Sequence, residues 1–146
     1  MTADAPSGTP FLCPSTSADN ATQVIGVVQS ADDGCARVAY AGGPVPFTAE
    51  LRLLTQPVDA AEVLRLAGPC VEHRCAHHVD DRCSLGERAV SLLPAVVPRA
   101  PRCSIRSHCR WYAEQGMAAC LRCPGIVTST HAGDDRMRAA ATPPAG

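Results

Sequence analysis

Residues 103–124, CSIRSHCRWYAEQGMAACLRCP, decide how this chain folds. The stretch carries four of the nine cysteines and a run typical of a helix over residues 110–119, which Gly116 interrupts. Cys109 and Cys120 then flank this helix at its opposite ends. The sequence therefore predicts a short, broken helix with a thiol at each end.

Seven cysteines fall into two blocks, and an eighth lies far upstream. The first block is Cys70-x4-Cys75-x7-Cys83, and the second block is Cys103-x5-Cys109-x10-Cys120-x2-Cys123-Pro124. Cys13, in Phe11-Leu12-Cys13-Pro14, brings the total to eight, which is enough for two sites of four thiolates. The predicted metal ligands are thus Cys13, Cys70, Cys75, Cys83, Cys103, Cys109, Cys120 and Cys123, and Cys35 is left over.

The composition explains why such a chain needs cross-links. Its 146 residues fit one domain, but only 3% are aromatic, so the supply of large core side chains is thin. Met1 to Pro10 lacks the features of a signal peptide, and no apolar run approaches a membrane span. We therefore expect a cytoplasmic protein whose thiols stay reduced, and an odd cysteine count also argues against a pure disulfide framework.

The spacing favours iron-sulfur clusters over zinc. Structural zinc sites pair their ligands with two to four residues between them. Only Cys120 and Cys123 form such a pair closely, Cys70 and Cys75 are at the limit, and the other gaps are longer. An iron-sulfur cube is larger than one ion and takes thiolates from more dispersed positions, and a proline after the last cysteine is typical of ferredoxin ligation. We expect two four-iron four-sulfur clusters, with zinc, and then redox-active disulfides, as the alternatives.

Arginine is enriched beside these cysteines. Every basic residue of the chain is an arginine, and five of the sixteen chain neighbours of the eight cysteines are arginines, about threefold above expectation from composition. Guanidinium groups beside thiolates favour deprotonation and lower the effective charge of a cluster. The predicted supporting residues are Arg74, Arg82, Arg102, Arg110 and Arg122. Among the histidines of the two blocks, His77 is the alternative ligand if Cys13 does not reach the first block.

The remaining pattern predicts a small α+β fold, in which an N-terminal β-hairpin precedes short helices organised around the metal clusters. The hairpin pairs residues 21–28 with 35–41 across a turn at 31–34. Helices are expected over 58–67, stopped by Gly68-Pro69, and from a capping box at 84–87 to Pro94; short edge strands are expected at 44–47 and 51–54. Residues 1–10 and 129–146 are predicted tails around a single cysteine-rich metal-binding domain at 11–128.

Several function classes have no support. The net charge is −1, so overall charge does not favour binding to nucleic acid or to an anionic membrane. The sequence also has no phosphate-binding loop, nucleophile elbow or zinc-protease motif. We expect an accessory redox protein that exchanges electrons with a partner protein or senses redox state. The alternatives are a zinc-stabilised module in which residues 99–110 contact protein or nucleic acid, and an enzyme with an open cluster iron.

These motifs resemble a family of small cysteine-rich bacterial proteins, some of them labelled nitrogen-fixation proteins. The resemblance rests on Leu12-Cys13-Pro14, on the first block followed by residues 92–97 (LLPAVV), and on the segments CSIR (103–106) and CLRCPGIVT (120–128). It covers residues 11–128, and it implies that Cys13 is a ligand together with the other seven cysteines.

Overall fold

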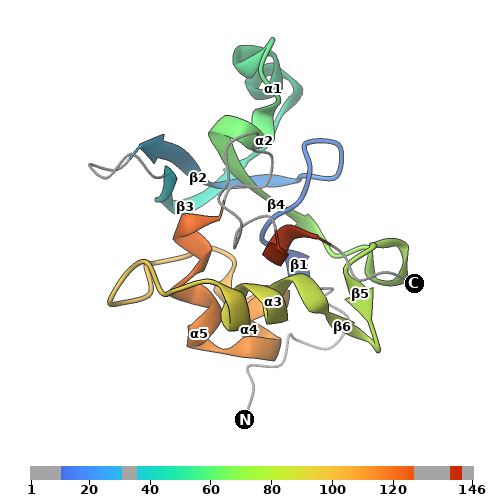
Figure 1. The fold of residues 1–146 in the computed structure, drawn as a ribbon. Coiled ribbons are helices and arrows are strands. Elements are labelled where there is room, and N and C mark those ends of the chain that lie inside the picture. The colour runs from blue at the N-terminus through green and yellow to red at the C-terminus, as the bar shows by residue number, and fades with distance from the viewer. Residues whose placement is uncertain (1–10, 31–35, 127–138, 143–146) are drawn as a thin grey trace.

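The computed structural model describes residues 11–30, 36–126 and 139–142 (Figure 1). The protein is a small α+β domain built on a four-stranded antiparallel sheet of order β1-β4-β2-β3. The strands are β1 (Leu12–Cys13), β2 (Gln23–Ser30), β3 (Ala36–Pro46) and β4 (Leu64–Pro69). The predicted pairing of the two hairpin strands is confirmed, because β2 pairs with β3 from Gln23↔Pro46 to Ser30↔Ala36 with one irregularity at Val24/Gly26. The predicted turn at 31–34 lies outside the described residues. The 44–47 segment extends β3 through Pro46.

Helices lie on both sides of this sheet (Figure 1). On one side are α1 (Ala49–Thr55) and α2 (Ala60–Val63); on the other are α3 (Ser84–Leu92), α4 (Arg110–Gln115) and α5 (Met117–Cys120). A small hairpin of β5 (His78–Val79) and β6 (Arg82–Cys83) precedes α3, and single 3-10 turns occur at η1 (Glu72–Arg74), η2 (Arg106–His108) and η3 (Cys123–Gly125). None of the helices in the described ranges is long and apolar enough to cross a membrane.

The central strand β4 corrects the predicted helix over 58–67. The helix α2 begins after Asp59, whose carboxylate accepts from Ala61 N–H at 3.0 Å, but it ends at Val63. The chain then continues as β4, which pairs with β2 on one side and β1 on the other. Judged from its local sequence, the run Leu64 to Ala67 could form a helix or a strand. It forms a strand because the neighbouring strands β1 and β2 provide backbone hydrogen-bond partners on both sides.

Two further local expectations are also wrong. Residues 51–54 form part of α1 rather than an edge strand, because the Thr48 hydroxyl caps the helix by accepting from Leu51 N–H at 3.1 Å. The capping box at 84–87 is not formed: Cys83 is the N-cap residue, and the Ser84 hydroxyl donates to the His77 carbonyl at 2.5 Å. By contrast, Gly116, with φ of 69°, breaks the last helix into α4 and α5 as predicted.

Alternation along β2 and β4 divides the core into two clusters. Val24 and Leu66 pack with Ala18, Ala60 and Ala61 on the α2 side of the sheet. Ile25 and Ala67 pack on the other side, with Ala89, Leu93, Ile105, Cys109, Trp111, Ala119, Cys123, Ile126 and Ala140. Successive strand residues point to opposite faces, so one strand serves both clusters. Residues 139–142, within the segment predicted as a tail, thus contribute Ala140 to the core.

Gly68 lies where β4 passes close to the loop before β2. A Cβ at this position would overlap the carbonyl oxygen of Asn20, which is backbone and cannot rotate away. We expect Gly68→Ala to lower the free energy of unfolding by about 1–3 kcal/mol, because overpacking forces the backbone to shift. Gly43→Ala is the matched control, since nothing lies within 4 Å of its Cβ, and it should change stability by less than about 0.5 kcal/mol. Urea denaturation measures both, and equal effects would contradict the prediction.

Candidate metal centre

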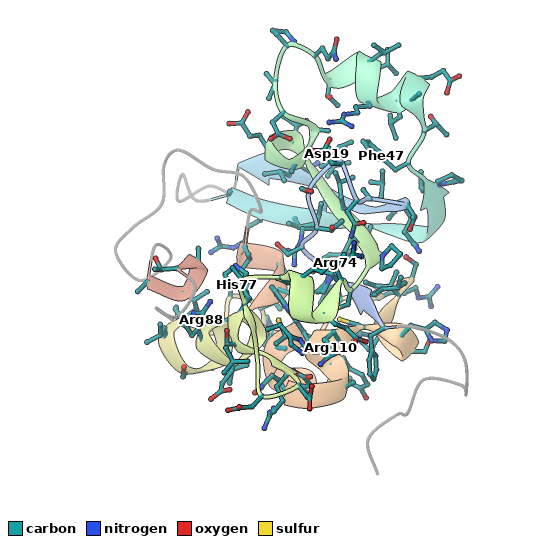
Figure 2. All side chains as sticks on the ribbon, turned by 90° about the vertical axis from the view of Figure 1, so that its right-hand side faces the viewer. Asp19, Phe47, Arg74, His77, Arg88 and Arg110 are labelled. Atoms are coloured by element: carbon teal, nitrogen blue, oxygen red, sulfur yellow. The ribbon has the colours of Figure 1, made fainter. Side chains whose placement is uncertain are left out.

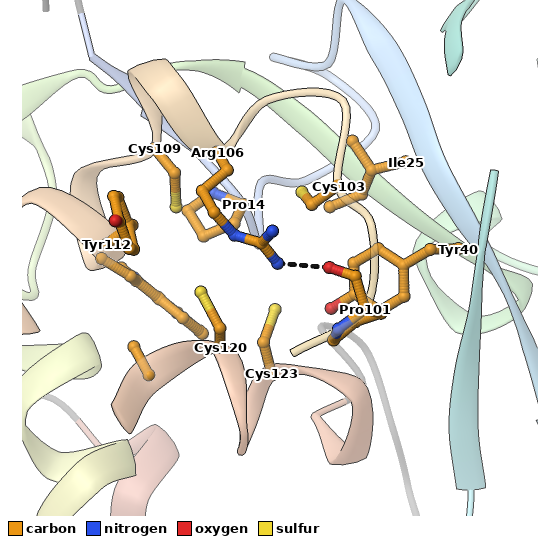
Figure 3. A pocket seen from close by; sticks show the side chains of 12 residues that line it. Pro14, Ile25, Tyr40, Pro101, Cys103, Arg106, Cys109, Tyr112, Cys120 and Cys123 are labelled. Atoms are coloured by element: carbon orange, nitrogen blue, oxygen red, sulfur yellow. Dashed lines mark hydrogen bonds between the residues drawn. The ribbon is translucent and has the colours of Figure 1, made fainter. Parts of the chain in front are cut away.

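The four cysteines of the second block line one pocket (Figure 3). Cys109 is the N-cap residue of α4, Cys120 ends α5, Cys123 begins η3, and Cys103 precedes η2. The broken helix around Gly116 therefore turns the chain so that thiols distant in sequence face the same space. The other lining residues are Pro14, Ile25, Tyr40, Pro101, Arg106, Trp111, Tyr112 and Ala119.

Arg106 fills much of this pocket. Its side chain points between the cysteine sulfurs, and its guanidinium donates to the Pro101 carbonyl (Figure 3). Burial lowers the pKa of Arg106, but the hydrogen bond to Cys120 and the charge of that thiolate outweigh it and raise the pKa overall. The cavity left beside it is about 20 Å³, room for about one water molecule. A larger occupant therefore requires the Arg106 side chain to move.

Buried polar atoms without partners occur in the segment that contributes two residues to the wall of this pocket. Five such atoms are found among the described residues, all between positions 104 and 115: Ser104 Oγ, Arg106 Nε, His108 Nδ1, Trp111 Nε1 and Gln115 Nε2. Arg106 and Trp111 line the pocket itself. Leaving a buried polar group unpaired costs about 1–3 kcal/mol, so these atoms indicate a missing partner. N–H donors beside four thiols fit a group rich in acceptor sulfur.

Three cysteines form a second group beside the first pocket. Cys13 lies opposite Gly68 in the β1–β4 ladder, and Cys70 N–H donates to the Phe11 carbonyl at 2.9 Å. Burial raises the pKa of Cys13 to about 12, and the charges of Cys83 and Cys70 contribute in the same direction, which places the three thiols within electrostatic reach. The structure thus places Cys13 near Cys70 and Cys83 of the first block.

The other two candidate ligands of this group lie around the β5–β6 hairpin. His78 N–H donates to the Cys75 carbonyl at 3.1 Å, and His78 pairs with Cys83, so backbone contacts link Cys75 to Cys83 through this hairpin. His77 contacts Arg88 on α3, whose Nη2 lies 2.6 Å from His77 Nδ1 (Figure 2). Because arginine only donates, that nitrogen accepts the bond, and Nε2 is the ring nitrogen left for a metal.

The pKa of Cys83 is raised overall, although its position at a helix N-terminus acts in the opposite direction. Burial raises the pKa of Cys83, but the N–H groups of Gly86 and Leu85 and the Trp111 indole lower it. Trp111 Nε1 makes no regular hydrogen bond among the described residues, and Cys83 is the sulfur it acts on. Glu114 accepts from Cys83 N–H at 2.8 Å. Trp111 therefore lies between the two groups of thiols.

The five predicted supporting arginines have different surroundings. Arg74, Arg82 and Arg102 are exposed. Arg110 is buried, pairs with Glu114 at 2.7 Å and stacks on Phe11. Arg122 donates to the Leu93 and Ala118 carbonyls, both at 2.8 Å. Of these, Arg110 is tied to the first block through Glu114.

Sequence reasoning missed the arginine with the closest cysteine contact. Arg65 on β4 is fully buried, and its Nη2 donates to Cys123 Sγ at 3.0 Å. The sequence did hold a signal of this contact, an arginine inside the apolar run Val63-Leu64-Arg65-Leu66-Ala67. A charged side chain in such a run is buried only when it has a partner. The expected helix would have left it on a solvated face.

The cysteines of both groups are free thiols in this structure, and Cys35 lies outside the described residues. Among the described side chains, no three His, Cys, Asp or Glu residues converge as ligands of a single metal ion. The chain matches no protein-family model, no curated protein and no solved structure. The site is therefore interpreted from its own geometry.

Buried thiols make the stability of the metal-free, reduced protein depend on pH. Burial raises the pKa of Cys13 from its ordinary 9.0 to about 12 and also raises the pKa of Cys109. As the pH rises, the unfolded chain therefore loses these protons before the folded chain does. The contribution of the neutral buried thiols to the stability is fully present below pH 9 and is lost as the pH rises towards 12. Urea denaturation across this range should show the decline, and Cys13→Ala should reduce it. The same decline in the variant would contradict this assignment.

Proposed function

We propose that this chain is an iron-sulfur protein that binds two four-iron four-sulfur clusters. The second block would hold one cluster, and Cys13 with the first block would hold the other. The observation that carries the proposal is the convergence of Cys103, Cys109, Cys120 and Cys123 on one pocket. A cube of this type takes one thiolate at each of its four irons, and when bound it supplies one-electron oxidation and reduction.

Individual N–H donors beside the thiols support an anionic, sulfur-rich occupant of the pocket. The unpaired N–H groups of Arg106 and Trp111 lie in its wall, and Arg65 donates to Cys123. Hydrogen bonds and positive charge around a cluster's thiolates stabilise its reduced form and so raise the reduction potential. The role of these residues would be to orient the thiolates and offset their charge.

Single zinc ions fit this arrangement less well. Structural zinc needs four ligand atoms at about 2.0–2.3 Å from one ion. The described cysteines include no group of three arranged in that way. A cube holds its thiolates further apart, which agrees better with ligands spread over η2, α4, α5 and η3.

The position of the two groups favours electron transfer or redox sensing in a reducing compartment such as the cytoplasm. Leu12, next to Cys13, forms an isolated bridge with Cys109, so the backbone directly joins the two groups. Neighbouring redox centres suit the passage of single electrons to a redox partner protein. Burial of Trp111 and Cys123 protects this region from water.

Chemical analysis of protein purified without oxygen tests the proposal. We expect a brown protein with about eight irons and eight sulfides per chain and broad absorption near about 400 nm that bleaches with dithionite. About four irons would support a single cluster only. A colourless protein with stoichiometric zinc, or one without metal after anaerobic reconstitution with iron and sulfide, would contradict it.

A further inference from the structure

Arg65 is a buried cation, and within the described part of the chain none of its hydrogen-bond partners is a carboxylate. Its exposed fraction is 0%, and Nε donates to the Pro14 carbonyl at 2.5 Å. Nη1 donates to the carbonyls of Cys123 at 2.7 Å and Ile126 at 3.0 Å, and Nη2 donates to Cys123 Sγ at 3.0 Å. Of these partners, only the sulfur can carry a negative charge. Because burying an unpaired charge is costly, a thiolate site that includes Cys123 is well placed to offset the charge of Arg65.

The same guanidinium also reaches the other group of thiols. It donates to the carbonyl of Pro14, the residue after Cys13. Burial raises the pKa of Cys13, and the charge of Arg65 acts in the opposite direction, so the guanidinium lies within electrostatic reach of that sulfur. Arg65 also lies over the ring of Trp111, 5.5 Å from its centroid, and the indole N–H acts on Cys83.

We propose that Arg65 is a positioning residue shared by both thiolate sites, whose buried positive charge raises the reduction potential of each. This inference rests on the proposed function. In the step concerned, one electron passes from a one-electron donor to a site, and the site becomes more negative by one charge. A cation fixed 3.0 Å from a ligand sulfur stabilises that added charge, and low polarity around it strengthens the effect. The effect is largest at the second block, which Arg65 contacts directly.

Two substitutions distinguish the effect of the Arg65 charge on the reduction potentials from the effect of its hydrogen bonds. Arg65→Gln keeps N–H donors and removes the charge. Arg65→Lys keeps the charge but loses the planar guanidinium with its fixed arrangement of N–H donors. Arg52→Gln is the control, because it makes the same chemical change on α1, on the other side of the sheet, where Arg52 pairs with Asp19 at 2.7 Å. Iron and sulfide are measured first, and midpoint potentials are then measured by dithionite titration followed by electron paramagnetic resonance.

Arg65→Gln should shift the second-block reduction equilibrium at least tenfold towards the oxidised form, which is about 59 mV for one electron. The first-block site should shift in the same direction by less. Arg65→Lys should shift the equilibrium by less than tenfold, and Arg52→Gln should leave it unchanged. Loss of the second-block cluster from Arg65→Gln but not from Arg65→Lys would also support the role of the charge.

Unchanged potentials in Arg65→Gln would overturn the inference while leaving the iron-sulfur proposal intact. Equal shifts in Arg65→Gln and Arg65→Lys, or loss of the cluster from both, would assign Arg65 a role in hydrogen bonding alone and would also overturn it. Wild-type protein without iron would instead contradict the proposed function, so the two failures are distinguishable.

Discussion

Replacing Cys123 by alanine is expected to halve the iron content, from about eight to about four atoms per chain. The substitution removes one of the four thiolates that line the second-block pocket. It also removes the sulfur that accepts from the buried Arg65 at 3.0 Å. Leaving a buried hydrogen-bonding group without its partner costs about 1–3 kcal/mol, so the metal-free variant should also be less stable.

Cys120→Ala separates these two effects. Cys120 lines the same pocket, but it contacts Arg106, which is only partly buried. This variant should lose the same amount of iron with a smaller loss of stability in the metal-free protein. Cys35→Ser should keep the wild-type iron content. Iron analysis and urea denaturation measure these outcomes, and full iron in Cys123→Ala would exclude it as a ligand.

Leu66→Ala is expected to lower the free energy of unfolding by about 2–5 kcal/mol. Leu66 is fully buried on β4 and packs against Val24, Ala60 and Ala61, so its loss leaves a cavity between the sheet and α2. Leu54→Ala, on α1, makes the same chemical change at a side chain that is 81% exposed. It should alter stability by less than about 0.5 kcal/mol. Similar losses in the two variants, measured by urea denaturation, would contradict the placement of β4.

The sequence was sufficient for features encoded by local chemistry. The hairpin strands are rich in β-branched residues, and Gly116 supplies a backbone conformation that other residues adopt at a cost. Cysteine spacing likewise identified the four residues that share the second-block pocket. All of these features are determined by residues that lie close to one another in the sequence.

Features that depend on distant contacts could not be predicted in this way. The strand β4 exists because β1 and β2 lie on either side of it, and neither contact is visible in the run Leu64 to Ala67. Arg65 was missed for the same reason, since its partners Pro14 and Cys123 lie far from it in sequence. Adjacency to cysteine, which singled out Arg74 and Arg82, instead identified exposed side chains.

The bond between Arg65 and Cys123 also bears on the order in which the chain is made. These residues are separated by 58 positions, so Arg65 leaves the ribosome well before Cys123 is made. At a synthesis rate of about 5–20 residues per second, several seconds pass between the two residues, and the guanidinium stays hydrated during this time. Closure of the sheet around β4 is therefore a late event of synthesis, and any nascent chain that stops short of Cys123 should remain open and sensitive to proteases.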